Sequence, residues 1–543
     1  MLGLAEWSWW ISEPGSPGFR DRAWQWTALP PTLGGHVLGA WSIDLADRVI
    51  PRAPWPGIVT TQTLSAATDS VQSVPLGAGA SGGFGGTLST LETTPATPTG
   101  WRTRSVLYLA SGADGYTDNG LSIERGDSLR LARIETVASD RGTTGSLGNS
   151  GRHEWQAFVR SQWGRHRVEG GFVHRGEALR LVSNEEQSAG GEGGWATYTY
   201  LRPSWVGRLG FERAYDHHHS FGGELLESLR DSQSDLSFLE IVASAGAWTL
   251  AGRAEVTEAQ VRRQGEGAFF QDARWGWATV SASRALGGGR ATAALGGGRH
   301  GGIDQNTYAP SLEWRSAPGA FEVRAAAARV LWAAWSDLAA GEEPFLQSTW
   351  AGTVDAHWRT GTRALRGWVM AGRTEDRAIL TRAPIEELWL REGIRVDPDP
   401  YPFALAGGEA RWVRGNWSFA GEGYGLTRPE SVEQARVDPA WGGRALGEYR
   451  TGFFGGDLGL RARFGVEAVG ARESEAIDPR TIPAYATVMA GLTLTLADAT
   501  FHALVRNLED QRRPEPWIDP GTGSEAIGTG VEYRFAFTVR LSN

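Results

Sequence analysis

Two short motifs in the sequence contain residues that could do chemistry. Gly79-Ala80-Ser81-Gly82-Gly83 matches the G-x-S-x-G pattern of a hydrolase nucleophile, which needs a strand before the serine and a helix after it. A Thr-rich stretch typical of a β-strand follows instead, so we expect a glycine-rich turn here. Asp216-His217-His218-His219 has the side chains of a metal site. Neighbours on a strand point to opposite faces, so three consecutive histidines cannot all face one ion, and we favour a solvated loop.

Glycine and arginine form two further motifs. Gly-Gly-Gly-Arg occurs at 287–290 and again at 296–299, and both copies superficially resemble phosphate loops. Neither begins a helical stretch, as a phosphate loop of a nucleotide-binding protein would. Turns, and glycines at tight positions within strands, explain both copies better.

Arginine and glutamate share strand faces near the C-terminus. The residues are Arg461, Arg463 and Glu467 on one face, and Arg534, Arg540 and Glu532 on another. We favour ion pairing between them, and the alternative is a charged channel that guides an anionic ligand. No two carboxylates are spaced as an acid/base pair. We therefore expect a protein that is not an enzyme, with no catalytic residue, no metal site and no cofactor. The sequence leaves the ligand-binding residues unidentified.

Composition narrows the class of protein. The 543 residues suffice for three or four domains or for one large sheet closed on itself. There is no Cys, which excludes disulfides, thiolate metal sites and a cysteine nucleophile. All 53 basic residues are Arg, so the lysines of phosphate loops, Schiff bases and kinases are absent. The net charge of −9 argues against a nucleic-acid partner.

The elements that must position these residues are strands. From residue 101 onward apolar and polar residues alternate with a period of two, whereas 1–100 is irregular and rich in Pro, Thr, Ser and Gly. In the last segment Val531, Tyr533, Phe535, Phe537, Val539 and Leu541 share one face. Similar alternation occurs at 154–163, 457–468 and 486–496. Weaker alternation occurs at 101–112, 126–138, 165–175, 194–206, 234–244, 246–257, 271–283, 318–331, 345–359, 362–373, 404–414 and 439–453. We expect roughly twenty strands, and a short helix at Pro384–Arg391 within a long loop.

Two features favour a barrel in lipid over a soluble sandwich. Faces that carry Arg and Glu together recur on many strands, as expected for the wet lumen of a barrel whose closure removes unpaired edges. Tryptophan also clusters near strand ends, where indoles suit a membrane interface. These residues are Trp195, Trp205, Trp275, Trp277, Trp332, Trp335, Trp412, Trp417 and Trp441. The alternative is that tryptophan fills a sandwich core or stacks on sugars.

The N-terminal residues carry no evident targeting signal. They lack the basic region and long apolar core of a signal peptide, and no apolar run of about 18 residues could span a membrane as a helix. Either the chain stays in the cytoplasm or this sequence is a processed or truncated form. The strand pattern favours export.

The C-terminal region resembles the end of a TonB-dependent receptor. Ile482-Pro483-Ala484-Tyr485 is similar to the family's PAY motif at the start of a late strand. Phe501–Asp510 (FHALVRNLED) is similar to the following strand, which ends in NLxD. Gly77–Thr90 resembles the glycine-rich close of the family's plug domain, and Leu33–Leu38 is faintly similar to an earlier plug strand.

The resemblance implies an all-β fold with a plug-like or partial plug region at 1–100. Residues 101–543 would form a large antiparallel transmembrane barrel of about 22 strands. The implied protein is an outer-membrane receptor that takes up a scarce solute, such as a metal chelate or a saccharide. Its partners would be outer-membrane lipid, the solute and a TonB-type energy-coupling complex, without nucleic acid. His217–His219 would then lie on an outer loop and could help to capture a metal chelate.

Two alternatives to this receptor remain open. One is a passive porin or structural outer-membrane barrel without energy coupling. The other is a secreted all-β binding protein or hydrolase whose tryptophans bind sugar.

Overall fold

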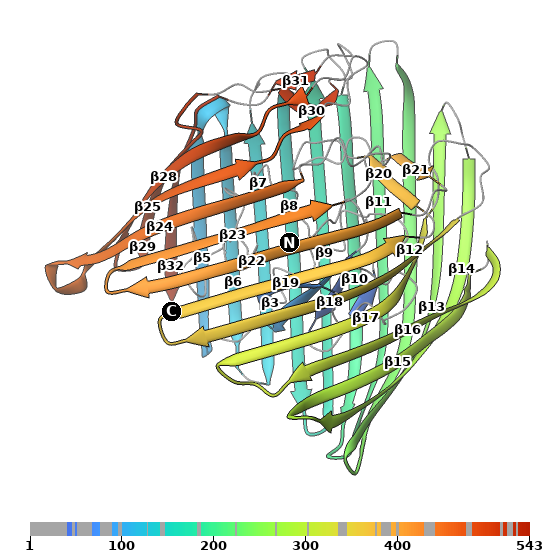
Figure 1. The fold of residues 1–543 in the computed structure, drawn as a ribbon. Coiled ribbons are helices and arrows are strands. Elements are labelled where there is room, and N and C mark those ends of the chain that lie inside the picture. The colour runs from blue at the N-terminus through green and yellow to red at the C-terminus, as the bar shows by residue number, and fades with distance from the viewer. Residues whose placement is uncertain are drawn as a thin grey trace.

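The structure is a computed structural model that describes residues 41–45, 49–51, 68–75 and 89–95 and, with breaks mostly at connections, 100–542. Within this part of the chain 22 strands close into an antiparallel barrel in which each strand pairs with its neighbours and β32 pairs with β5. Figure 1 shows the barrel from the side, with the strands of the front wall running obliquely to those of the back wall. The prediction of a 22-stranded barrel is therefore confirmed.

The barrel strands have the following bounds: β5 Gly100–Gly112, β6 Thr117–Gly126, β7 Arg130–Arg141, β8 Leu147–Trp163, β9 His166–Leu181, β10 Glu186–Leu201, β11 Trp205–Gly222, β12 Leu225–Ala245, β13 Trp248–Gly265, β14 Phe269–Leu286, β15 Gly289–His300, β16 Ile303–Ser316, β17 Phe321–Ala334, β18 Phe345–Thr360, β19 Arg363–Thr374, β22 Tyr401–Arg414, β23 Trp417–Thr427, β24 Trp441–Phe453, β25 Leu458–Val469, β28 Tyr485–Leu496, β29 Ala499–Arg506 and β32 Glu532–Ser542.

Small elements accompany the barrel. Three two-stranded hairpins lie in its connections: β20 Arg377–Thr381 with β21 Gly393–Asp397, β26 Arg472–Glu473 with β27 Thr481–Ile482, and β30 Pro514–Ile518 with β31 Glu525–Ile527. Two 3-10 turns are η3 Ala113–Gly115 and η4 Phe454–Gly456. The expected helix at Pro384–Arg391 lies outside the described residues. No described helix is long and apolar enough to cross a membrane.

A separate four-stranded sheet precedes the barrel. It has the order β2-β1-β4-β3, with β1 Trp41–Leu45, β2 Val49–Pro51, β3 Thr68–Pro75 and β4 Ser89–Pro95. Strands β1 and β4 are parallel, unlike any pair in the barrel. In both figures its blue strands lie behind the front wall, within the outline of the barrel.

The last strand shows which face of the sheet is apolar. Tyr533, Phe535 and Phe537 of β32 are exposed on the outside, whereas Glu532 and Arg534 are buried on the inside. A soluble sandwich would place the apolar row inward, against a second sheet. The outward apolar row instead matches the lipid-facing band of a transmembrane barrel, as the alternation predicted.

The connections divide the barrel into two ends. At one end the described strands are joined by turns of two to four residues, such as Gly164–Arg165 and Gly415–Asn416. At the other end the connections vary, from two residues between β11 and β12 to the 26 residues of 375–400, the longest. In outer-membrane barrels the short turns face the periplasm and the long loops face outward. We refer to the short-turn end and the long-loop end below.

The predicted tryptophan belt is confirmed in part. Trp412, Trp417 and Trp441 are exposed on the outer face. The prediction of an interfacial position is wrong for three tryptophans, which are buried on the inner face: Trp195, Trp275 and Trp277. Trp205 is half-buried, and the side chains of Trp332 and Trp335 lie outside the described residues.

Glycine makes room for one of the inward tryptophans. A Cβ built on Gly296 would lie 2.5 Å from Trp277 Cζ2, and one built on Gly298 would lie 2.7 Å from Trp277 Cε3. The second Gly-Gly-Gly-Arg motif is therefore part of a strand that packs under an indole. The first forms the turn between β14 and β15, where Gly287 and Gly288 have positive φ. Both interpretations of these motifs are confirmed.

Candidate functional site: the inner wall of the barrel

The inner wall is formed by alternate residues of each strand, and its buried side chains include both apolar and charged groups. A series of ion pairs follows this wall around the barrel, from β6 and β7 to β25 and β29. The pairs are Arg133–Glu124, Arg167–Glu169, Arg208–Glu240, Arg253–Glu255, Arg324–Glu313, Arg366–Asp355, Arg444–Glu422, Arg463–Glu448 and Arg506–Glu467. Because charges so placed need partners, this ladder neutralises much of the wall.

Two of these pairs show how closely the groups are matched. Arg366 donates to Asp355 at 2.7 Å and lies 3.6 Å from Glu409 on the next strand. Glu448 is fully buried and accepts from Arg463 at 2.7 Å and from Arg450. The predicted pairing of lumenal charges is confirmed in kind, but the partner of Arg463 is Glu448, which the sequence reasoning did not name.

Buried charged and amide side chains gather on the wall along β6 to β8, which we call the polar arc. Asp118 is fully buried and accepts a hydrogen bond from the Tyr116 hydroxyl at 3.2 Å. Arg133 donates from Nε and from the terminal nitrogen to Glu124, at 2.9 and 2.6 Å. Glu135, Glu154 and Gln156 also face inward and are buried. This arc concentrates three buried glutamate and aspartate side chains and one amide on three adjacent strands, besides the pair of Arg133 with Glu124.

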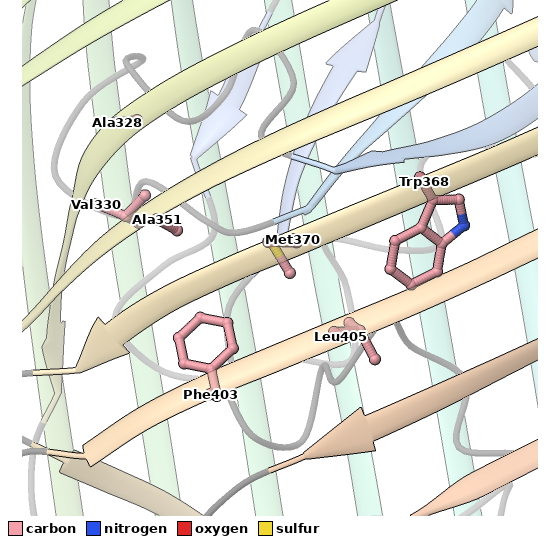
Figure 2. Close-up of a cluster of buried hydrophobic side chains, with 7 residues drawn as sticks. All are labelled: Ala328, Val330, Ala351, Trp368, Met370, Phe403 and Leu405. Carbon is pink, nitrogen blue, oxygen red and sulfur yellow. The ribbon is translucent and has the colours of Figure 1, made fainter.

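Toward the long-loop end, the wall carries a buried apolar cluster along β17 to β23, which we call the apolar arc. Nearer the short turns the same strands carry the ion pairs of Arg324 and Arg366. Its buried cluster consists of Ala328, Val330, Ala351, Trp368, Met370, Phe403 and Leu405. Figure 2 shows these side chains on adjacent strands, with blue strands of the N-terminal sheet behind them. Met370 is 0% exposed, although its neighbour Val369 is 54% exposed on the outer face. Met370 therefore points into the barrel and is covered there.

A small pocket lies in the wall next to the polar arc. Tyr108, Arg463, Thr493, His502 and Arg534 are among the residues that line it. The Thr493 hydroxyl and His502 Nδ1 are 3.1 Å apart, and the Arg534 guanidinium lies 4.1 Å from the centre of the Tyr116 ring. Histidine, hydroxyl and guanidinium groups could together bind an anionic or polar group.

The other candidates from the sequence do not form a site. Asp216–His219 lies within β11, so the expected loop is wrong. Of its side chains only His217 is described, with its ring 6.2 Å from that of Tyr215. Among the described residues no group of three His, Cys, Asp or Glu could hold a metal ion. Gly79–Gly83 lies outside the described residues, as does Leu33–Leu38.

Comparisons with known proteins show the fold. No family model matches the sequence, and no curated protein resembles it in sequence. Among solved structures, the chain is similar to BauA, the ferric preacinetobactin receptor from Acinetobacter baumannii, with a TM-score of 0.70 and 10% identity over 88% of this chain and 86% of that one. It is also similar to the copper transporter OprC, with a TM-score of 0.72 and 12% identity over 92% and 90%.

A third similar structure is the FrpB iron transporter from Neisseria meningitidis, with a TM-score of 0.70 and 10% identity over 93% of both chains. These neighbours are TonB-dependent receptors with a 22-strand barrel. The chain therefore has the fold of TonB-dependent receptors along nearly its whole length. At such low identity the likeness extends to the fold alone, so the function must be argued from this chain's own residues.

Proposed function

We propose that the protein is an outer-membrane receptor that takes up a scarce solute through a barrel closed by its N-terminal region. The observation that carries the proposal is the burial of Met370 and Leu405, which point into the barrel and are nevertheless covered. An open water-filled pore would leave such side chains exposed, at a cost in free energy that scales with their apolar area. Their burial supports a plug within residues 1–100, with 101–543 as the barrel.

The names of the neighbours and the chemistry of the wall support a metal or a metal chelate as the solute. The neighbours are named for ferric preacinetobactin, copper and iron, which favours a metal or metal chelate over a saccharide. The polar arc and the pocket at Arg463, His502 and Arg534 supply charged and hydrogen-bonding groups for such a polar solute. A TonB-type complex would supply the energy for passage, since a closed barrel does not conduct by itself.

Conductance across a planar bilayer tests the proposal. The full chain should insert without a steady current, and calorimetric titration with a panel of ferric and cupric chelates should find at least one that binds. The alternative is a passive porin or structural barrel, which the many charged groups on the wall would also suit. A steady open pore in the wild-type chain would favour that alternative and contradict the receptor.

A further inference from the structure

Arginine is concentrated at the short-turn end of the barrel. Among the described residues within four positions of the short turns or of the barrel's first residue, thirteen arginines are exposed, against two exposed carboxylates, Asp457 and Asp498. The arginines are Arg102, Arg125, Arg130, Arg165, Arg202, Arg284, Arg290, Arg315, Arg359, Arg363, Arg411, Arg414 and Arg450. The long-loop end has the opposite balance. Its longest connection, 375–400, contains seven carboxylates and four arginines in sequence.

Part of this group faces the lipid rather than the lumen. Strand alternation puts Arg125, Arg130, Arg284, Arg363 and Arg414 on the outer face. Arg165 and Arg202 lie in turns beside that face. We call these seven residues the arginine collar. At the outward positions of the same strand ends, the described residues include no Asp or Glu. The collar therefore places positive charge on the outer surface along the part of the barrel that runs from β6 to β22.

Aromatic rings hold part of the collar at one level. The Arg202 guanidinium lies 5.5 Å from the Tyr200 ring and 5.9 Å from the Trp205 ring, and its Nε donates to the Tyr200 hydroxyl at 3.2 Å. Arg284 lies 5.3 Å from the Trp248 ring. Interfacial tryptophan and tyrosine mark the level of lipid headgroups. These guanidinium groups therefore lie where headgroup phosphates would be.

Outward arginines at the long-loop end are arranged differently. Arg213 lies opposite Asp235 on the next strand, with Nε 2.6 Å from the carboxylate. Arg274 lies opposite Glu258, at 3.2 Å. Each of these arginines has a cross-strand carboxylate as a counter-charge.

Among the described residues, the outward strand positions near the short turns carry no carboxylate. Asp127 of the β6–β7 turn lies beside Arg125 and Arg130. However, its carboxylate accepts from the backbone nitrogens of Leu129 and Arg130. A counter-charge for the other collar arginines must therefore come from outside the sheet.

We propose that the arginine collar binds the phosphate groups of anionic phospholipids in the periplasmic leaflet of the membrane. The short-turn end faces the periplasm in such barrels, which places the collar at that leaflet. A guanidinium binds phosphate through two parallel hydrogen bonds, and clustered basic side chains attract anionic lipid. The inference needs only the barrel and its orientation, so it stands whether or not the protein transports a solute.

Native mass spectrometry of the full chain tests this binding. The protein is taken from nanodiscs that contain equal amounts of phosphatidylglycerol and phosphatidylcholine. Wild type should retain phosphatidylglycerol several-fold over phosphatidylcholine. The fourfold variant R202Q/R284Q/R363Q/R414Q should retain the two lipids about equally, and Lys at the same four positions should restore most of the preference. Arg262 on β13 and Arg373 on β19 are, like Arg213 and Arg274, exposed outward arginines near the long-loop end. The control R213Q/R262Q/R274Q/R373Q therefore removes equal charge at that end and should keep the preference.

Three results would overturn the proposal. The first is equal retention of both lipids by wild type, and the second is a loss of preference in the long-loop control as large as in the collar variant. The third is a collar variant that keeps its lipid preference but no longer binds peptidoglycan sacculi. The last result would assign the collar to the cell-wall polymer. If the collar variant does not fold, the wild-type protein is measured at low and at high salt. A preference for phosphatidylglycerol that depends on exposed charges should disappear at high salt, and a preference that persists would contradict the proposal.

Discussion

The polar arc and the apolar arc occupy opposite sides of the barrel. In the ring of 22 strands, β7 and β18 are eleven strands apart. The polar arc buries Asp118 and Glu135, and the apolar arc buries Met370 and Leu405. Their outer faces are alike, since Ile134 and Val369 are both exposed to lipid. The requirement for lipid contact therefore makes the outside uniform, and only the inner face distinguishes one arc from the other.

This difference indicates where a plug would be held. Both arcs are buried, but an apolar surface inside a barrel loses stability when its cover is removed, whereas a wall of paired charges tolerates the return of water. We therefore expect the N-terminal sheet to stay on the apolar arc, and the polar arc to be the side that is uncovered when the solute passes. The following substitutions test that division, from the largest expected effect to the smallest.

The largest effect is expected in the polar arc, for Glu124→Gln. The substitution removes the carboxylate that faces Arg133, whose side chain is 3% exposed. Breaking a buried ion pair costs about 3–5 kcal/mol, because the remaining charge stays out of water. The temperature at which the folded gel band converts to the unfolded band should fall clearly. An unchanged temperature would show that water reaches this part of the wall.

Met370→Ala should have the next largest effect and should act on the apolar arc. Truncation of a fully buried methionine leaves a cavity and costs about 2–5 kcal/mol. If the arc holds the plug, the variant should also show brief current bursts in a bilayer, which Glu124→Gln should not. Bursts in both variants, or in neither, would contradict the division between the two arcs.

Gly296→Ala tests the wall between the two arcs. The added methyl group would lie 2.5 Å from Trp277, so the indole must move. Overpacking of this kind costs about 1–3 kcal/mol. Gly276→Ala is the matched control, because a Cβ at Gly276 meets nothing within 4 Å. The thermal shift should be seen for Gly296→Ala and be smaller or absent for Gly276→Ala.

Glu258→Gln should have the smallest effect. It makes the same chemical change as Glu124→Gln, but its partner Arg274 is 71% exposed and Glu258 is 59% exposed. Exposed ion pairs contribute little to stability, because water already solvates both groups. The unfolding temperature should match wild type. If Glu258→Gln lowered the unfolding temperature as much as Glu124→Gln, burial could not explain the stability of the Glu124–Arg133 pair.

The outer face of the barrel was predictable from sequence because lipid imposes one rule on every strand. The alternation of Val531–Leu541 correctly placed apolar residues outside and charges inside. The inward direction of Trp277 was not predictable, because it depends on space left by Gly296 and Gly298 on a neighbouring strand. The strand predicted at 194–206 also missed a turn, because β10 ends at Leu201 and β11 begins at Trp205. Both residues are apolar, so the sequence pattern did not reveal the short turn between them.

The apolar arc escaped sequence reasoning for a physical reason. A strand with apolar residues on both faces loses the period of two, as in 318–331, 362–373 and 404–414, where the alternation was weak. Weak alternation also occurs at 126–138 in the polar arc, so it does not by itself identify an apolar inner face. The histidine run was misplaced because β11 has 18 residues, more than the about 9–11 needed to cross lipid. Period alone does not show where a strand leaves the membrane.

The seam of the barrel joins β32 to β5, the last strand to the first. Every nascent or truncated form of the chain that lacks the eleven residues of β32 would have two bare edges. Bare edges in hydrocarbon leave backbone groups without hydrogen bonds, so such a form cannot enter lipid by stages. Insertion must therefore wait for the C-terminus, and until then the unpaired strand edges have to stay out of the hydrocarbon.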